Sequence, residues 1–88
     1  MWFAYALRSE VVDGGFYVGM TSRLQQRIKE HNAGRNRSTR PRLPFELVYV
    51  EHFDSRTAAR SREKYLKSGV GRELLKKVAA EKLKEHAE

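Results

Sequence analysis

Cysteine is absent from this chain of 88 residues. Its absence excludes disulfide bonds, thiolate metal sites and a cysteine nucleophile. Long apolar runs are missing too, because the N-terminal one, Trp2 to Leu7, is only six residues long. A run of that length is too short for a signal peptide or a membrane span. We therefore expect a soluble protein of the reducing cytoplasm.

Several common functional motifs are also missing. Gly69-Val70-Gly71 lacks the lysine and the strand-to-helix context of a phosphate-binding loop. No two histidines stand at the spacing of a zinc site, and no serine lies in a nucleophile elbow. These absences remove the simplest nucleotide-binding, zinc and serine-hydrolase interpretations.

Acidic residues are scarce relative to basic ones, and the net charge at pH 7 is +7. Residues 19–43 carry seven Lys and Arg against Glu30 alone, and residues 56–77 carry eight against Glu63 and Glu73. Two such blocks, separated by slightly acidic segments, favour a basic face that binds nucleic acid. The alternative is a basic surface that only keeps the protein soluble.

Three segments are predicted to be strands. Residues 2–8 are apolar at nearly every position, as expected of a strand covered on both faces. Residues 16–20 follow the turn signal Asp13-Gly14-Gly15, which predicts a hairpin. The third segment, residues 45–53, alternates between two sets, Phe45, Leu47 and Tyr49 against Glu46, Val48 and Val50.

Three helices are expected, from Thr21 or Ser22 to Gly34, from Asp54 or Ser55 to near Gly69, and from Gly71 to His86. Leu24 and Ile28 form the buried stripe of the first. The apolar side of the third comprises Leu74, Leu75, Val78, Ala79 and Leu83. Residues 35–44, with four arginines and two prolines, are expected to be a mobile loop.

The resulting order, β-β-α-β-α-α, predicts an α+β fold with a small three-stranded antiparallel sheet flanked by helices. The length predicts a single domain over residues 1–88. Its core would cover about residues 2–70, with a C-terminal helix at 71–86.

Glu63 is the anomalous residue of the second helix. At about 100° per residue, Leu66 and Val70 lie near it on the helical wheel, in the stripe that should face the sheet. A buried carboxylate needs a compensating cation. An arginine would serve, and so would Mg²⁺, which often takes only one or two protein ligands. The pattern alone favours a structural ion pair.

Four other residues are chemically suggestive. Arg27 and His31 are one helical turn apart, where they could bind a phosphate and carry a proton. Taken alone, such a pair is more often a solvated helix surface. Tyr5 and Tyr17 stand on neighbouring strands, where aromatic residues are usually core. A tyrosine can act as a base where cations stabilise its phenolate, and this chain has many.

Short motifs containing these residues follow one another along the chain: Phe3-Ala4-Tyr5, Tyr17-Val18-Gly19, Arg23-Leu24, Arg27-Ile28, His31-Asn32, Leu47-Val48-Tyr49 and Arg62-Glu63-Lys64. Eleven residues separate Tyr5 from Tyr17. In this order and spacing, residues 2–70 resemble a GIY-YIG nuclease domain. The resemblance is closest to small stand-alone bacterial members and to the nuclease domain of structure-selective endonucleases.

The resemblance implies a metal-dependent phosphodiester hydrolase whose five key side chains converge around one bound cation. Glu63 would hold Mg²⁺ or Mn²⁺, and Arg27 would bind the scissile phosphate. Tyr5 would activate the attacking water, with His31 and Tyr17 in support. The apolar surroundings of Glu63 then become the dry wall of a metal site.

Two departures from the family pattern stand out. Phe3 and Ala4 replace the glycine and isoleucine of the first triplet, which varies widely in the family. No asparagine follows Glu63, whereas some members carry one. A water molecule or Ser68 would have to substitute for it, or activity would be weak.

We therefore expect a Mg²⁺-dependent endonuclease acting on DNA flaps, branches or single strands, in repair or recombination, with RNA as an alternative substrate. The contacts to nucleic acid would come from Arg23, Arg35, Arg37, Arg40, Arg42, Lys64 and Lys67. One alternative is a binding module of the same fold with little activity. Another is an accessory subunit that docks a protein partner through the apolar side of the C-terminal helix.

Overall fold

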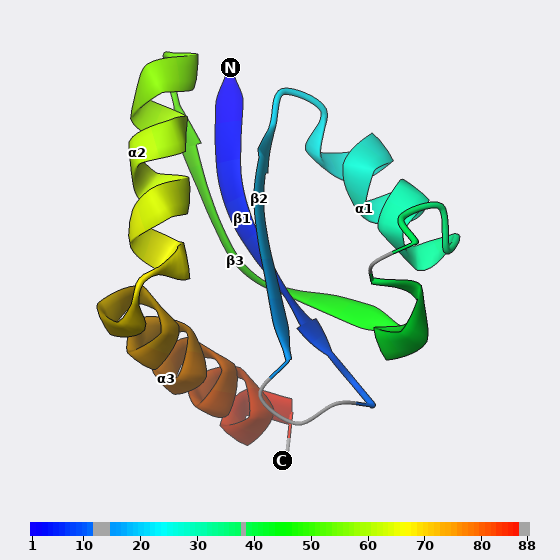
Figure 1. The fold of residues 1–88 in the computed structure, drawn as a ribbon. Coiled ribbons are helices and arrows are strands. Elements are labelled where there is room, and N and C mark those ends of the chain that lie inside the picture. Colours follow the sequence, from blue (N-terminus) through cyan, green and yellow to red (C-terminus); the bar gives the residue numbers. More distant parts are fainter. Residues whose placement is uncertain (12–14, 38, 87–88) are drawn as a thin grey trace.

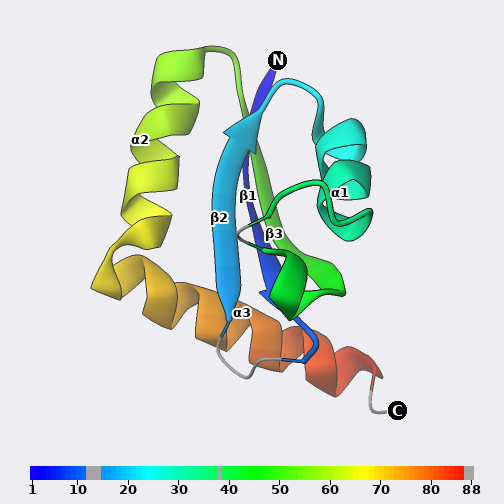
Figure 2. The ribbon, with the colours of Figure 1, turned by 45° about the vertical axis from the view of Figure 1, so that its right-hand side comes forward.

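A computed structural model of the chain describes residues 1–11, 15–37 and 39–86, which form a three-stranded antiparallel sheet between helices (Figure 1). The elements are β1 (Trp2–Ser9), β2 (Phe16–Thr21), α1 (Leu24–Asn32), β3 (Phe45–Phe53), α2 (Arg56–Lys67) and α3 (Gly69–His86). One face of the sheet is covered by α1, and the other by α2 and α3 (Figures 1 and 2). The expected α+β fold and element order are confirmed. In the part of the chain described, no helix has the length and apolar character needed to cross a membrane.

The central strand is β1, which lies between β2 and β3. Ala4, Tyr5, Ala6 and Leu7 are all fully shielded from solvent. Because side chains alternate along a strand, Ala4 and Ala6 pack toward α2 and α3, whereas Tyr5 and Leu7 pack toward α1. Burial on both faces explains the almost continuous apolar sequence of this strand. The hairpin residues Asp13 and Gly14 lie outside the described residues.

A bulge interrupts the pairing of β3 with β1. Ala6 lies opposite Tyr49, but the next residue of β1 lies opposite Leu47, which leaves Val48 as the extra residue. A bulge shifts the alternation of side chains by one position. Phe45 and Leu47 therefore pack toward α1, whereas Tyr49 packs on the opposite face. The expectation that these three share one side was wrong.

The first turn of α1 starts later than expected. The cap position is Arg23, without a side-chain cap, and neither Thr21 nor Ser22 occupies it. Thr21 still belongs to β2, and its hydroxyl accepts a 3.0 Å bond from the Arg23 N–H in the turn between the two elements. The strand therefore takes Thr21, one of the two residues expected to start the helix.

Gly34 ends α1, as expected. Its φ is +76°, which is strained for residues with a side chain. The amides of Gly34 and Arg35 bond to the carbonyls of His31 and Glu30, at 3.0 and 3.2 Å. This pattern is a Schellman motif, and it fixes the last turn of the helix around His31.

Residues 35–37 and 39–44 are more structured than the expected mobile loop. They contain a short 3₁₀ helix, Arg40–Arg42, and Thr39 just before it is fully buried. The hydroxyl of Ser9 in β1 donates a 2.6 Å bond to the Arg42 carbonyl. A buried anchor and a bond to the central strand hold this segment against the end of the sheet.

Ser55 caps α2, as one of the two alternatives predicted, because its hydroxyl accepts a bond from the third backbone N–H after it. The helix ends at Lys67, and α3 begins at Gly69, two residues earlier than expected. Val70 therefore lies in the first turn of α3 and is 68% exposed, so it is not part of the stripe that contains Glu63.

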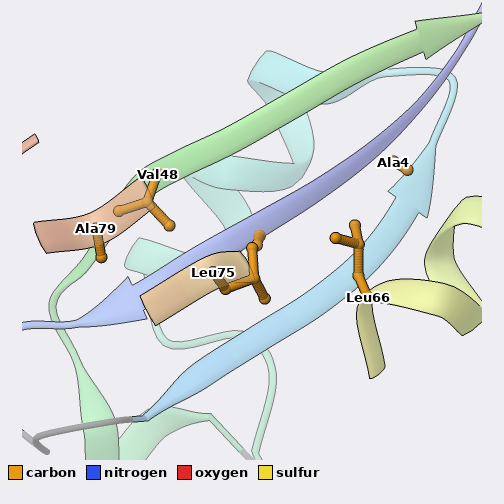
Figure 3. Close-up of a cluster of buried hydrophobic side chains, with 6 residues drawn as sticks. Ala4, Val48, Leu66, Leu75 and Ala79 are labelled. Carbon is orange, nitrogen blue, oxygen red and sulfur yellow. The ribbon is translucent and has the colours of Figure 1, made fainter. Parts of the chain in front are cut away.

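The apolar side of α3 packs on the sheet. The buried cluster on this face comprises Ala4, Ala6, Val48, Leu66, Leu75 and Ala79 (Figure 3). Leu75 has no exposed surface and Ala79 has only 5%. The side chain of Leu83 lies outside the described residues. Along the described part of α3 this side is core, which removes the basis for expecting it to dock a protein partner.

Candidate active site

Tyr5, Tyr17 and His31 meet on the α1 face of the sheet, from three different elements. The hydroxyl oxygen of Tyr5 lies 3.4 Å from Nε2 of His31. The ring centroid of Tyr17 lies 4.4 Å from that of His31 and 6.4 Å from that of Tyr5. Tyr5 and His31 are both buried, so the three rings form a polar cluster inside an otherwise apolar layer.

Gly19 makes room for this cluster. It pairs with Tyr5 across the two strands. A Cβ on Gly19 would lie 2.7 Å from the Tyr5 hydroxyl oxygen and 2.9 Å from its Cζ. Real Cβ atoms essentially never approach other atoms this closely, so a glycine is needed where the phenol crosses β2. The only sequence signal for this role is the last letter of the triplet Tyr17-Val18-Gly19.

The pKa of Tyr5 is raised to about 12, mainly by burial and then by the neighbouring Tyr17. Arg27 lowers it but does not offset these effects. Arg27 therefore stabilises a Tyr5 phenolate too weakly to overcome burial, contrary to the expectation from charge. Tyr5 is a neutral phenol at pH 7, so it can accept a proton only while giving up its own. His31 Nε2 is the acceptor within reach.

His31 is suited to that role because it is uncharged. Burial lowers its pKa below the ordinary value of 6.5, and the positive charge of Arg27 lowers it further, against a smaller effect of Glu30. The second ring nitrogen, Nδ1, lies 3.5 Å from the hydroxyl oxygen of Thr39. The cluster thus contains a neutral imidazole held between two hydroxyl groups.

Arg27 lies beside the ring cluster and is open to solvent, with 43% of its side chain exposed. Its guanidinium is 3.7 Å from the carboxylate of Glu30. Burial acts to lower the pKa of Arg27, but hydrogen bonding to the Tyr5 and Tyr17 hydroxyls outweighs it and raises the pKa. Arg27 is therefore a permanent cation between solvent and the two phenols, where it can receive a phosphate.

Glu63 belongs to α2, which covers the face of the sheet opposite to that covered by α1 (Figure 2). Its side chain is 14% exposed, and its carboxylate is 3.6 Å from Lys67 Nζ. Glu63 and Tyr17 both line a hollow of about 310 Å³. Because β2 is an edge strand, Tyr17 can contact both sides of it. Its ring packs against the ring of His31, and it also lines the hollow that contains Glu63. Four of the five expected side chains thus gather on one face, and the fifth lies across the β2 edge.

Glu63 is the one carboxylate among the described residues that line its hollow. Over the described ranges no three His, Asp or Glu side chains cluster, so any metal site here rests on one protein carboxylate. Mg²⁺ accepts such a site, because it keeps several waters and takes oxygens from a phosphate substrate. The hydroxyl of Ser68, one of the two expected substitutes for the missing asparagine, donates to the Tyr65 carbonyl and accepts from the Gly71 amide. The residues present fit a single-carboxylate Mg²⁺ site.

Two further hollows adjoin Arg27, which lines both. One, of about 310 Å³, is also lined by Arg35 and Arg37. The other, of about 340 Å³, extends to Arg23 and Trp2. These positions bring three of the predicted nucleic-acid contacts beside Arg27.

The remaining predicted contacts lie elsewhere. Arg40 and Arg42 belong to the 3₁₀ helix, where Arg40 Nε donates a 2.8 Å bond to the carbonyl of Gly34. Lys64 is exposed on α2, and Lys67 pairs with Glu63. These residues do not line the hollows beside Arg27.

Three residues near the site were not predicted for a role there. Gly19 leaves space for Tyr5, Thr39 contacts His31, and Arg72 lines the hollow that contains Glu63. Arg72 belongs to the second basic block but carries no distinguishing pattern. Thr39 is one of two adjacent hydroxyl residues in an arginine-rich segment, so no sequence signal marked it.

Comparison with known proteins places this geometry in a family. Residues 1–77 match the family model described as the GIY-YIG catalytic domain. A UPF0213 protein of Clostridium perfringens is 37% identical over 86 residues, which cover 97% of this chain and 90% of that protein. A UPF0213 protein of Haloquadratum walsbyi is 43% identical over 67 residues, 75% of each chain.

A solved structure agrees with these matches. The solution NMR structure of a UPF0213 protein from Bacillus halodurans superposes with a TM-score of 0.52 and 34% identity, covering 89% of this chain and 85% of that one. Because the family model spans most of the chain and the relatives are covered over most of their length, the chain belongs to the GIY-YIG family of nuclease-type catalytic domains.

Proposed function

We propose that this protein is a metal-dependent endonuclease that hydrolyses phosphodiester bonds in DNA of unusual structure, in repair or recombination. The observation that carries the proposal is the Tyr5 hydroxyl, 3.4 Å from a neutral His31, beside the solvent-exposed cation of Arg27. This arrangement offers an anion site and a proton acceptor side by side. The family and the two basic blocks support nucleic acid as the substrate.

In the proposed mechanism, Arg27 binds the scissile phosphate and meets the charge that develops on it. Tyr5 takes a proton from the attacking water while its own proton passes to Nε2 of His31. The water becomes the nucleophile, Tyr5 ends as a neutral phenol, and His31 ends as an imidazolium. This concerted transfer avoids a free phenolate, which the raised pKa of Tyr5 makes rare at pH 7.

Glu63 would hold the metal ion, Mg²⁺ or Mn²⁺. When bound, such an ion polarises the phosphate and eases departure of the leaving oxygen. In the free protein, Lys67 compensates the charge of Glu63. A substrate phosphate lying across the edge of β2 would face Arg27 on one side and the Glu63 hollow on the other.

The two hollows beside Arg27 support a preference for strands that are not fully paired. Arg35 and Arg37 can neutralise backbone phosphates on one side of the scissile bond, whatever the base sequence. On the other side, the half-buried Trp2 lines a hollow in which an unpaired base can stack. A flap or junction supplies both features at once.

A cleavage panel tests this function. Labelled flap, branched, single-stranded and duplex DNA, with RNA copies, are incubated with Mg²⁺, Mn²⁺ or chelator. We expect metal-dependent cutting of the flap and branched DNA, reduced roughly 10²–10³-fold in Arg27→Ala and Glu63→Gln. Matched controls are Arg60→Ala, which alters an exposed arginine, and Glu73→Gln, at a carboxylate that is 75% exposed.

Circular dichroism checks that each variant is folded. Binding without cutting, in every metal and on every substrate, would overturn the proposed activity. That result would favour a nucleic-acid-binding module that keeps the fold.

A further inference from the structure

Thr39 is fully buried, although it lies in an arginine-rich segment outside the sheet and the three α-helices. Among the described residues, its hydroxyl has two neighbours in hydrogen-bonding range. It donates to the backbone carbonyl of Asn36 at 3.2 Å, and it lies 3.5 Å from Nδ1 of His31. A buried hydroxyl between a carbonyl and an imidazole constrains where the imidazole proton can lie.

A threonine hydroxyl carries one proton, and a backbone carbonyl can only accept. In the structure the hydroxyl of Thr39 donates to the Asn36 carbonyl, which also accepts from the N–H groups of Thr39 and Arg40. In this orientation the oxygen of Thr39 is left to accept from His31. In neutral imidazole one nitrogen is protonated and the other is not. With the Thr39 hydroxyl in this orientation, the tautomer that completes the contact carries its proton on Nδ1 and leaves the lone pair of Nε2 facing the Tyr5 hydroxyl.

We propose that Thr39 is a positioning residue that fixes His31 in the Nδ1-protonated tautomer, so that Nε2 is free to receive the proton of Tyr5. The catalytic part of this inference rests on the proposed nuclease function, whereas the tautomer does not. In the transfer, the Tyr5 O–H bond breaks as the Nε2–H bond forms, and a water proton restores the phenol. The opposite tautomer would place a proton on Nε2 and block this step.

The surroundings of His31 support an uncharged partner at Nδ1. Tyr5 and Tyr17 face the ring from β1 and β2, and Arg27 and Glu30 act on it from its own helix. A hydroxyl orients the imidazole through one hydrogen bond without the negative charge by which a carboxylate would favour the imidazolium. His31 can therefore stay both neutral and fixed in orientation.

The first test is the ¹⁵N NMR spectrum of the imidazoles at a pH where His31 is neutral, with His31 assigned by the loss of its signals in His31→Gln. We expect the wild-type protein to show a protonated Nδ1 and an unprotonated Nε2. A protonated Nε2 in the wild-type protein overturns the proposal, and this result needs neither a variant nor cleavage activity.

The second test compares Thr39→Val, which keeps the shape and removes the hydroxyl, with Thr39→Ser, which keeps the hydroxyl. We expect Thr39→Val to lose the single tautomer and to slow single-turnover cleavage about tenfold or more, with DNA binding unchanged. Thr39→Ser should restore both the tautomer and the rate.

The outcomes separate the hydrogen-bond assignment of Thr39 from its catalytic role. Full cleavage by Thr39→Val, or a slow Thr39→Ser that keeps the tautomer, would overturn the catalytic role. If wild-type protein shows the expected tautomer but cuts no substrate, the proposed nuclease function fails while the hydrogen-bond assignment stands. If Thr39→Val does not fold, the wild-type spectrum and the Thr39→Ser rate still decide.

Discussion

The two faces of the sheet are built from alternate residues of the same central strand, yet their chemistry differs. On the α2–α3 face, Ala4 and Ala6 belong to a cluster of apolar side chains only. On the α1 face, Tyr5 is buried beside His31 and Thr39, whose polar atoms bond to one another. The buried centre of the first face is apolar, with the Glu63 hollow near the β2 edge, whereas the other face contains buried groups that can move a proton.

The difference indicates a division of labour. Apolar burial supplies most of the free energy of folding, and small residues such as Ala4 let helices pack closely on β1. Buried polar groups contribute less to stability but need fixed partners. Substitutions of the buried apolar residues on the α2–α3 face should therefore mainly change stability, whereas those in the polar cluster on the α1 face, and at Glu63 near the β2 edge, should mainly change chemistry.

The largest effect is expected for Leu75→Ala on the apolar face. Removing a fully buried leucine side chain leaves a cavity, so the free energy of unfolding should fall by about 2–5 kcal/mol. Urea denaturation measures it. The control, Val70→Ala, alters a side chain that is 68% exposed and should change stability by only about 0.5 kcal/mol or less. Equal losses in the two variants would contradict the assignment of Leu75 to the core.

Gly19→Ala, on the α1 face, should change the cleavage rate more than the stability. The new Cβ would force the Tyr5 phenol to shift, and a misplacement of about 1 Å can slow catalysis on the order of 10²-fold. Single-turnover cleavage measures this effect. Gly69→Ala is the matched control, because a Cβ there meets nothing within 4 Å. A fully active Gly19→Ala would show that the position of Tyr5 is not critical.

The two hollows beside Arg27 can be separated by binding in chelator. Trp2→Ala should weaken binding of flap DNA by roughly 1–3 kcal/mol and leave duplex binding unchanged, since only an unpaired base can stack. Arg37→Ala should weaken both and reduce the salt slope by about 1. Fluorescence anisotropy of labelled DNA measures the affinity of each of the two variants for flap DNA and for duplex DNA. Because Trp2 is the sole tryptophan, its own emission should also change with flap DNA. Equal losses on both substrates for Trp2→Ala would remove the base-stacking role.

The smallest effect concerns pH. The folded-state pKa of His31 lies below its ordinary value, so the unfolded chain binds the proton more readily. Stability should be full above about pH 6.5 and should fall as the pH drops from there toward the lowered pKa. His31→Gln should lose this part of the pH dependence in thermal melts from pH 8 to 5, whereas His52→Gln, at an exposed position, should keep it. Identical pH profiles for wild-type protein and His31→Gln would contradict a buried neutral imidazole.

Much of the fold could be predicted from local patterns. An apolar run with no polar face, such as residues 2–8, is typical of a central strand, and Gly34 after an amphipathic segment marks a helix end. The bulge at Val48 could not be predicted, because it depends on how β3 pairs with β1. The helical wheel also placed Val70 in the wrong helix, since it assumes that one helix continues.

The sequence motifs predict a set of site residues but not their arrangement in space. Motif order pointed to Tyr5, Tyr17, Arg27, His31 and Glu63. Sequence spacing does not say which face of the sheet a helix covers, so the separation of Glu63 from Arg27 around the β2 edge was not foreseen. The raised pKa of Tyr5 follows from burial, which outweighs the net positive charge of the chain.

The claim that Glu63 and the buried cluster serve a single reaction across the β2 edge has one direct test. Single-turnover cleavage of flap DNA in Mg²⁺ is measured for Tyr5→Phe, Glu63→Gln and the double variant. Residues that act as a unit are strongly non-additive, so the double variant should be about as slow as the slower single variant. If the two losses multiply, or if either single variant cuts at the wild-type rate, the two sides of the edge do not form one active site.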